Sequence, residues 1–359
     1  MTFLLAILGL GLLVGGAELL VRGAAGLAGA AGITPLVIGL TVVAAGTSAP
    51  ELAVSLQGAL SGRPDLAVGN VVGSNLANVL LILGASALIA PLTVSRQVVR
   101  VDVPLMIGAS LLLVVLAEDG RVGRLDGLLL VAGIVSYVVL QIRLGRRGAA
   151  VGPAVDAPPP VRGGWPAQVA LVVVGLGLLV LGARWLVNGA VAGAQAMGVS
   201  ELVIGLTVVA VGTSMPEIAT ALLATFRGQR DLAIGNVVGS NIFNLLAILG
   251  LSAVVSPGGL PVAHAAAAFD IPVMVAAAVA CLPIAFTGYV IARWEGGLFL
   301  GLYVAYTVYV VLNATEHDAL PAYSTVMGAF VLPLAAATLL VLALNAYRRQ
   351  RGPGPSPGG

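Results

Sequence analysis

The sequence is short of charge. Only 9% of its residues are charged, whereas a soluble domain carries about 25%. With 59% hydrophobic residues, the chain is therefore expected to lie in a lipid bilayer. Lysine is absent, and the arginines are spread over loops, so no basic patch indicates a nucleic-acid partner.

Side chains for soft-metal or redox chemistry are equally scarce. The single cysteine, Cys281, excludes a disulfide framework within the chain. The two histidines, His264 and His317, stand apart in polar turns, which argues against a histidine metal site. No nucleotide-binding loop is present. We therefore expect no enzymatic activity and no cofactor, and no feature indicates an obligatory protein partner.

Two apolar stretches occur twice. IGLTVVAAGTSAPELA at residues 38–53 returns as IGLTVVAVGTSMPEIA at 204–219, and GNVVGSNLANVLLILG at 69–84 returns as GNVVGSNIFNLLAILG at 235–250. Every position is displaced by 166 residues, so neither block needs a gap. Each copy of the first block holds a glutamate, Glu51 or Glu217. A charge at the bilayer centre costs roughly 2.5–3.5 kcal/mol on insertion scales, so we interpret both glutamates as parts of an ion path.

Hydrophobic runs predict the architecture, since a spanning helix needs about 20 apolar residues. Candidate spans lie near 3–22, 33–61, 65–90, 99–117, 126–144, 166–187, 199–226, 231–255, 269–288, 293–313 and 325–346. We expect an all-α polytopic membrane protein with two five-helix repeats, ten spans in all, plus one extra C-terminal span. The expected units are a first repeat at 1–145, a cytoplasmic linker at 146–164, a second repeat at 165–314, an extra helix within 315–347 and a disordered tail at 348–359.

The arginines predict the orientation. With the N-terminus outside, 13 of the 17 arginines fall in cytoplasmic segments and 4 on the other side. The positive-inside rule thus favours an outer N-terminus and a cytoplasmic C-terminus. Five spans per half then make the second repeat run opposite to the first. Such inverted repeats place a substrate site near the membrane midplane, between the halves.

The motif GTSAPE at residues 46–51 predicts a broken helix. Pro50 has no N–H, and its ring clashes with the carbonyl of Gly46, four residues earlier. We expect carbonyls around residues 44–47 to lack helical partners, which is tolerated at membrane depth only inside protein or beside a water-filled cavity. A cation can take such carbonyls as ligands. GTSMPE at 212–217 repeats the arrangement.

Residue spacing gathers side-chain oxygens on single helix faces. Thr47 and Ser48 precede Glu51 by four and three residues, so all three can project together. Two further pairs are four residues apart: Ser74 with Asn78, and Ser240 with Asn244. Carboxylates, amides and hydroxyls are hard ligands that suit Ca²⁺, which takes about 6–8 oxygens. The serines suit close helix packing equally well, and the sequence leaves both roles open.

Other charged residues indicate structural roles. Glu18 and Arg22 are four apart on the first span and are expected to pair. Asp102 and Asp270 each stand two residues before a proline, where we favour a helix N-cap over a role in ion entry.

At the duplicated motifs the chain resembles the cation/Ca²⁺ exchanger superfamily, and most closely its prokaryotic sodium/calcium exchanger branch. The family repeats carry GTS-x-PE followed by GN-x-x-GSN, and both motifs occur twice here, in order, within residues 3–313. The resemblance implies a secondary antiporter in the inner membrane of a prokaryotic cell. Its substrates would be Ca²⁺ and Na⁺, with the lipid bilayer as its surroundings, and it would extrude Ca²⁺ by alternating access.

The resemblance also implies residue roles. Glu51 and Glu217 would be shared by Ca²⁺ and Na⁺, and Thr47 and Thr213 would offer carbonyls to Ca²⁺. The outer Na⁺ sites would be formed by Ser48, Ser214, Ser74 and Ser240 with the carbonyls of Ala44 and Ala210. Asn78 and Asn244 would line the centre. Some members have Asp at the position of Asn244. Because this chain has Asn at both central positions, its site would contain only two carboxylates.

Two alternatives stay open. A Ca²⁺/H⁺ exchanger of the same fold would use the glutamates as proton carriers, but proton-coupled relatives typically carry GNAPE where this chain has Ser48 and Ser214. A passive cation channel would show flux without a counter-ion, but its single filter loop is missing. For alternating access, we expect the first and sixth spans to slide against the core on glycine-rich surfaces formed by Gly9, Gly11, Gly15, Gly16, Gly175, Gly177 and Gly182.

Overall fold

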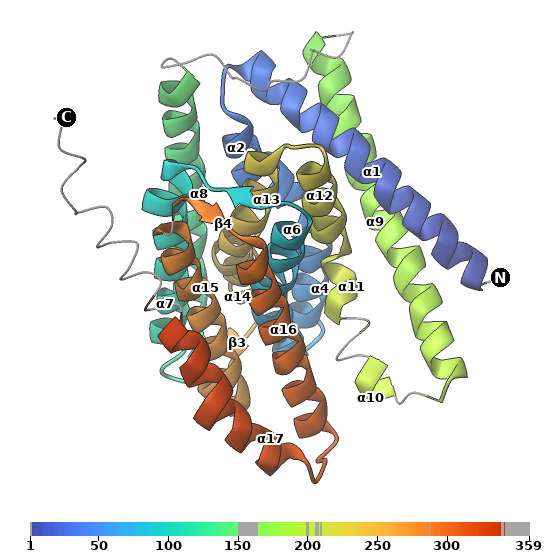
Figure 1. The fold of residues 1–359 in the computed structure, drawn as a ribbon, viewed down its shortest axis with the longest axis vertical. Coiled ribbons are helices and arrows are strands. Elements are labelled where there is room, and N and C mark those ends of the chain that lie inside the picture. The colour runs from blue at the N-terminus through green and yellow to red at the C-terminus, as the bar shows by residue number, and fades with distance from the viewer. Residues whose placement is uncertain are drawn as a thin grey trace, which may run out of the picture.

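A computed structural model describes residues 2–149, 164–198, 201–204, 208, 210–286, 288–338 and 341. In this part of the chain nearly all residues are helical, and the longest helices pack side by side (Figure 1). The expected helical class is therefore confirmed. Residues 150–163 of the predicted linker and the whole predicted tail at 348–359 lie outside the described residues.

The first half runs from α1 to α8, where η denotes a π-helical segment. Its elements are α1 (Thr2–Ala31), α2 (Pro35–Ile38), η1 (Gly39–Val43), α3 (Ala44–Thr47), α4 (Ala49–Leu60), α5 (Pro64–Leu76), η2 (Ala77–Leu83), α6 (Gly84–Ile89), β1 (Leu92–Thr93), η3 (Val98–Asp102), α7 (Val103–Leu116), β2 (Arg121–Val122) and α8 (Arg124–Ala149).

The second half runs from α9 to α16 and is followed by one further helical stretch. Its elements are α9 (Gly164–Ala196), α10 (Glu201–Ile204), α11 (Ala210–Thr213), α12 (Met215–Phe226), α13 (Arg230–Phe243), η5 (Asn244–Ile248), α14 (Leu249–Val255), β3 (Leu260–Pro261), η6 (Ala266–Asp270), α15 (Ile271–Phe286), β4 (Val290–Ile291), α16 (Arg293–Ala314), α17 (Leu320–Val326) and η7 (Met327–Val331).

The described helices make the chain an integral membrane protein. Eight are long and apolar enough to cross a bilayer, and a ninth span results if the bent pair Pro35–Thr47 and Ala49–Leu60 counts as one. Two more apolar helices, Met215–Phe226 and Ala266–Leu282, are shorter than a full span. Length and composition thus identify eight or nine spans in the described residues, against the predicted eleven.

Two spans form the centre of the molecule. In Pro64–Ile89 and in Arg230–Val255, 72% of the most apolar stretch is buried by protein, against 33% for the first span and 6% for Arg293–Ala314. These two spans carry the second duplicated motif. The surrounding helices cover them, which places the polar residues of that motif where lipid cannot reach.

Short strands join the two halves. β1 pairs antiparallel with β4, with Leu92 opposite Ile291, and β2 pairs with β3, with Val122 opposite Leu260. Each pair links a loop of the first half to a loop of the second. The halves are therefore connected at their loops as well as through the helices between them.

Helices α1 and α9 pack against each other through glycines. A Cβ atom on Gly16 would lie 2.8 Å from the carbonyl oxygen of Gly175, and one on Gly9 would lie 2.8 Å from that of Gly182. Such absence of side chains lets membrane helices approach closely. A Cβ atom on any of the other predicted glycines, Gly11, Gly15 and Gly177, would meet no atom within 4 Å. The close glycine contacts thus join α1 to α9, rather than forming a smooth surface toward the core.

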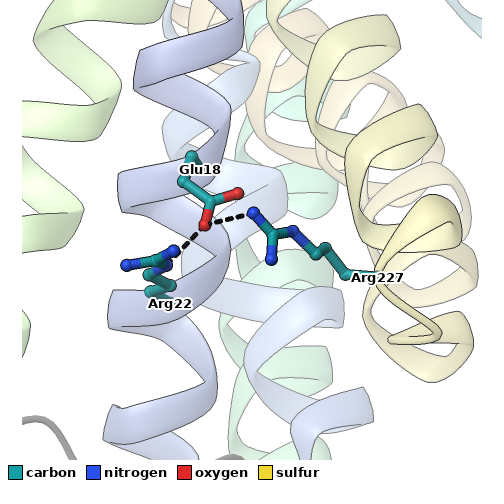
Figure 2. Close-up of polar contacts among 3 residues, drawn as sticks. All are labelled: Glu18, Arg22 and Arg227. Atoms are coloured by element: carbon teal, nitrogen blue, oxygen red, sulfur yellow. Dashed lines mark hydrogen bonds and ion pairs between the residues drawn. The ribbon is translucent and has the colours of Figure 1, made fainter.

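An ion pair fastens α1 to the end of α12. Glu18 contacts Arg22 at 2.5 Å, as the spacing predicts, and also Arg227 at 2.7 Å (Figure 2). Arg227 follows directly after α12. The positions equivalent to Glu18 and Arg227, displaced by 166 residues, hold Arg184 and Ser61, so this contact belongs to one half only.

Asp102 occupies the N-cap position of α7, as expected, but its side chain does not cap the helix. Asp102 ends η3 with helical backbone angles, and its side chain makes no capping hydrogen bond to α7. The chain enters α7 directly from η3, so no exposed first turn faces the carboxylate. Asp102 instead accepts hydrogen bonds from Gln141 and Gln97, and Asp270 accepts one from the Tyr306 hydroxyl at 2.9 Å.

The α1–α9 packing predicts a contrast between two neighbouring glycines. Gly16→Ala should destabilise the protein by about 1–3 kcal/mol, because its methyl group meets backbone atoms that cannot turn aside. Gly15→Ala should leave stability unchanged or raise it by up to about 1 kcal/mol, through better helix propensity. Thermal unfolding of both variants in detergent measures this. Equal melting temperatures would contradict the packing described.

Candidate functional site

The duplicated proline motif breaks a helix in both halves. Ser48 separates α3 from α4 with φ −79° and ψ 9°, and Ser214 separates α11 from α12 with φ −84° and ψ 8°. In the first half the two pieces meet at 46°. Pro50 and Pro216 each lie in the first turn of the new helix, where a missing N–H is harmless. The predicted break is confirmed.

One expectation about the break is wrong. The carbonyl of Ala44 accepts the N–H of Ser48 at 3.0 Å, so it has a helical partner. The carbonyl four residues before the proline belongs to Gly46, and it is this one that the proline deprives of an i+4 donor. The sequence predicted free carbonyls from about residue 44 onward, but helical hydrogen bonding still includes the carbonyl of Ala44.

The new helices begin beside the two glutamates. Glu51 and Glu217 lie in the first turns of α4 and α12, and both are 0% exposed. A helix N-terminus carries partial positive charge and favours a carboxylate. The break thus creates a favourable position for a negative charge at a depth where water is excluded.

Serines from the opposite half donate to both carboxylates. Ser48 Oγ donates to Glu217 Oε1 at 3.1 Å, and Ser214 Oγ donates to Glu51 Oε1 at 3.2 Å. Ser74 Oγ also lies 3.5 Å from Glu51 Oε1 and accepts from the Asn244 amide at 3.0 Å. The structure therefore brings the two motif copies together, with the two halves related by an approximate twofold exchange of partners.

Several buried oxygens in this region have no hydrogen-bond partner. They are Glu51 Oε2, Glu217 Oε2, Asn78 Oδ1, Asn244 Oδ1 and Ser240 Oγ. All five residues are 0% exposed. Buried polar atoms are nearly always hydrogen-bonded, so a group of unpartnered oxygens requires an explanation. Oxygens that lack donors are the ligands a hard cation takes.

The remaining predicted residues border this group. Ala44 and Thr47 begin and end α3, and Ala210 and Thr213 begin and end α11, directly before each break. The Thr47 hydroxyl lies 3.0 Å from Asn236 Oδ1 and 3.1 Å from its own helix carbonyl at Val43. Its side chain is therefore engaged within the protein, which leaves the backbone carbonyl as the atom available to the site.

Sequence reasoning missed four asparagines of the second motif. Asn70 donates to the Glu51 carbonyl at 3.0 Å and Asn236 donates to the Glu217 carbonyl at 3.4 Å, so each fixes the backbone of a carboxylate residue. Asn75 and Asn241 contact the amides of Asn244 and Asn78. The signal was available, because all four are duplicated with the same displacement of 166 residues.

Local helix geometry presents the central amides. Asn78 lies in η2, and Asn244 is the first residue of η5. Short π-helical segments inside α-helices occur frequently at functional sites, since the extra residue per turn re-aims neighbouring side chains. Both central asparagines thus occupy the same irregularity in the two buried spans.

Comparison with known proteins identifies the family of the chain. The family model described as sodium/calcium exchanger protein matches residues 1–143 and 167–312. Sodium/calcium exchanger MaX1 of Methanosarcina acetivorans is 35% identical over 342 residues, which cover 85% of this chain and 97% of that protein. Inner membrane protein YrbG of Escherichia coli is 39% identical over 270 residues, or 72% of this chain and 82% of that protein.

A solved structure is similar as well. The sodium-calcium exchanger NCX_Mj matches with a TM-score of 0.72 at 31% identity, over 84% of this chain and 95% of that one. The family match covers both copies of both duplicated motifs, so the resemblance inferred from those motifs is confirmed. The chain belongs to the sodium/calcium exchanger family.

Proposed function

We propose that the protein is a secondary antiporter that exchanges Na⁺ for Ca²⁺ and extrudes Ca²⁺ by alternating access. One observation carries the proposal: Glu51 and Glu217 each keep a buried carboxylate oxygen without a partner, and three more side chains of the duplicated motifs, Asn78, Asn244 and Ser240, also have unpartnered oxygens. Two carboxylates neutralise one Ca²⁺. The remaining hydroxyl, amide and carbonyl oxygens then complete a coordination of about 6–8.

The carboxylates make exchange the expected mode. A Ca²⁺ ion held between Glu51 and Glu217 uses the same two negative carboxylates that bound Na⁺ ions also require. The two substrates therefore exclude each other, and one must leave before the other binds. A passive channel does not need a binding site at which one ion must leave before the other can bind.

The individual ligands follow the resemblance. Glu51 and Glu217 serve both ions, the carbonyls of Thr47 and Thr213 serve Ca²⁺, and Asn78 and Asn244 line the centre. The outer Na⁺ sites use Ser48, Ser214, Ser74, Ser240 and the carbonyls of Ala44 and Ala210. Ser240 is supported by its unpartnered hydroxyl. The Ala44 carbonyl keeps a second lone pair beyond its helical bond, so it stays eligible.

The strand pairs support ten spans plus the extra helix. β2 and β3 can pair only if their loops lie on one side, so an even number of crossings separates them. Four candidate spans lie between these strands, which makes the short helix around Met215–Phe226 a true crossing. Six lie between β1 and β4, which by the same argument makes Ala266–Leu282 a crossing.

This count supports two inverted repeats at 1–145 and 165–314, with an extra helix after them. With the arginine distribution, it supports an outer N-terminus and a cytoplasmic C-terminus. The resemblance to Inner membrane protein YrbG of Escherichia coli supports residence in a prokaryotic inner membrane. Inversion lets one repeat adopt in turn the conformation of the other, so the shared site is exposed to alternate sides.

A cavity adjoins the first break. It has a volume of about 410 Å³ and is lined by Gly46, Ala49, Leu176, Gly177, Val180, Leu181 and Arg184. Gly46 and Ala49 flank Thr47 and Ser48, so the inner wall of the cavity is the break itself.

A Ca²⁺/H⁺ exchanger is the second candidate, because a buried carboxyl with one free oxygen can also carry a proton. Ser48 and Ser214 oppose it, because the proton-coupled relatives that this chain resembles typically carry GNAPE at the motif that reads GTSAPE and GTSMPE here.

The coupling ion is tested by flux. Proteoliposomes loaded with Na⁺ and diluted into Na⁺-free medium should accumulate radiolabelled Ca²⁺, because outward Na⁺ movement drives it inward. An imposed pH gradient without Na⁺ should drive none. Uptake driven by the pH gradient alone would transfer the chain to the proton-coupled alternative.

The carboxylate pair is tested by substitution. Glu51→Gln and Glu217→Gln should each lower Na⁺-driven Ca²⁺ uptake by about 100-fold or more, since each removes a charged ligand and adds a donor facing the ion. Glu295→Gln is the matched control, since Glu295 is also buried in a first helix turn and accepts the N–H of Ala292 at 2.7 Å. Normal uptake in both site variants would overturn the ligand assignment.

A further inference from the structure

The central amides present an orientation problem. An asparagine amide has an oxygen that accepts and an NH₂ group that donates, on two branches of similar size. Only the oxygen of Asn78 or Asn244 can bind a cation, whereas the NH₂ group repels it. Both oxygens are buried without a hydrogen-bond partner. Whatever holds the two amides in this orientation therefore determines whether the centre of the site attracts a cation.

Two further asparagines hold the nitrogen branches. Asn244 Nδ2 donates to Asn75 Oδ1 at 2.9 Å, and Asn78 Nδ2 donates to Asn241 Oδ1 at 3.1 Å. Both contacts cross from one half of the chain to the other. Asn75 and Asn241 are 2% exposed, so water does not compete for these bonds.

Methionine sulfurs in turn orient these two asparagines. Asn241 Nδ2 lies 3.3 Å from Met106 Sδ, and Asn75 Nδ2 lies 3.6 Å from Met274 Sδ and 3.5 Å from the Asn241 carbonyl. A thioether sulfur has no hydrogen to donate and accepts only weakly. It can therefore face the NH₂ branch of an asparagine but offers nothing to its oxygen.

Each chain of contacts thus has one direction. It begins at an acceptor-only sulfur on α7 or α15, passes through two amides, and ends at an unpartnered oxygen. Reversing Asn78 would set its oxygen against the Asn241 oxygen and leave both without donors in a dry interior, where an unsatisfied group is most unfavourable. Reversing Asn244 would leave the Asn75 oxygen without its donor, although Ser74 Oγ, which now accepts from the Asn244 amide at 3.0 Å, could donate to the reversed oxygen. The network therefore disfavours the orientation that would repel a cation, most strongly at Asn78.

We propose that Asn75 and Asn241, the amide brace, are positioning residues that hold the Asn244 and Asn78 oxygens toward the transported cation, with Met274 and Met106 setting the direction. Neither brace residue contacts the ion. This inference rests on the proposed function in one respect, that a cation binds between the two halves. It does not depend on which ion drives exchange.

The brace is tested by a double-mutant cycle on Ca²⁺ affinity. Asn241→Leu removes the acceptor for Asn78 and frees that amide to turn. Calorimetric titration of the full-length protein in detergent should show Ca²⁺ binding weakened about ten-fold. In proteoliposomes the Ca²⁺ concentration for half-maximal uptake should rise by a similar factor, with the maximal rate changed less.

The second arm of the cycle removes the orientation problem itself. In Asn78→Asp both side-chain oxygens accept, so no turn of the group can present a donor. Adding Asn241→Leu in that background should weaken Ca²⁺ binding by less than about two-fold. An equal ten-fold loss in both backgrounds would show that Asn241 acts through general packing, and would overturn the proposal. The pair Asn75→Leu and Asn244→Asp repeats the test on the other side.

A milder variant keeps the proposal testable if Asn241→Leu fails to fold. Met106→Leu keeps the volume but removes the sulfur acceptor, and should weaken Ca²⁺ binding by about three-fold. Met327→Leu, in η7 and away from the site, is the matched control and should bind as wild type does. Wild-type affinity in Met106→Leu would contradict the directing role of sulfur. Wild-type protein that binds Ca²⁺ but does not exchange it for Na⁺ would overturn the proposed function, while the binding cycle would still decide the brace.

Discussion

The structure depends on burying two carboxylates that each keep one oxygen without a protein partner. Isolated ionised carboxylates are strongly unfavourable in a medium of low polarity. Here the cost is offset locally, because Glu51 and Glu217 lie at helix N-termini and each accepts a serine hydroxyl. That leaves the charge stabilised but not neutralised. Under the proposed function, a bound cation would complete the balance of charge.

The site also requires both halves at once. Each carboxylate takes its serine donor from the other half, and each central amide is held by an asparagine of the other half. A single repeat would leave these groups unsatisfied in the membrane interior. Elements far from the site serve the same end: the strand pairs join the loops, and the two buried spans are shielded by the helices around them. The ion pair of Glu18 with Arg227 adds a contact that the repeat does not duplicate.

The features that sequence reasoning predicted are those set by chemistry along the chain. Pro50 and Pro216 must end a helix wherever they fall in the interior of one, and a glutamate next to the break follows directly. What the sequence could not give is pairing between helices. Spacing relates Ser74 to Asn78 on one helix, but it says nothing of Asn75 meeting Asn244. For the same reason, the sequence does not predict the contact between Glu18 and Arg227, which are 209 residues apart. The proline after Asp102 indicates a helix start, but a π-helical segment continues directly into that helix, so the side chain of Asp102 has no exposed first turn to cap.

In the proposed mechanism, one divalent cation joins the two free carboxylate oxygens. The most direct measurement is an experimental structure of the protein in Na⁺-free buffer, with and without Ca²⁺, using the anomalous signal to locate the ion. We expect one Ca²⁺ within about 2.3–2.6 Å of Glu51 Oε2 and Glu217 Oε2, with the oxygens of Asn78 and Asn244 facing it. Ca²⁺ bound elsewhere, with the two carboxylates engaged only by protein donors, would contradict it.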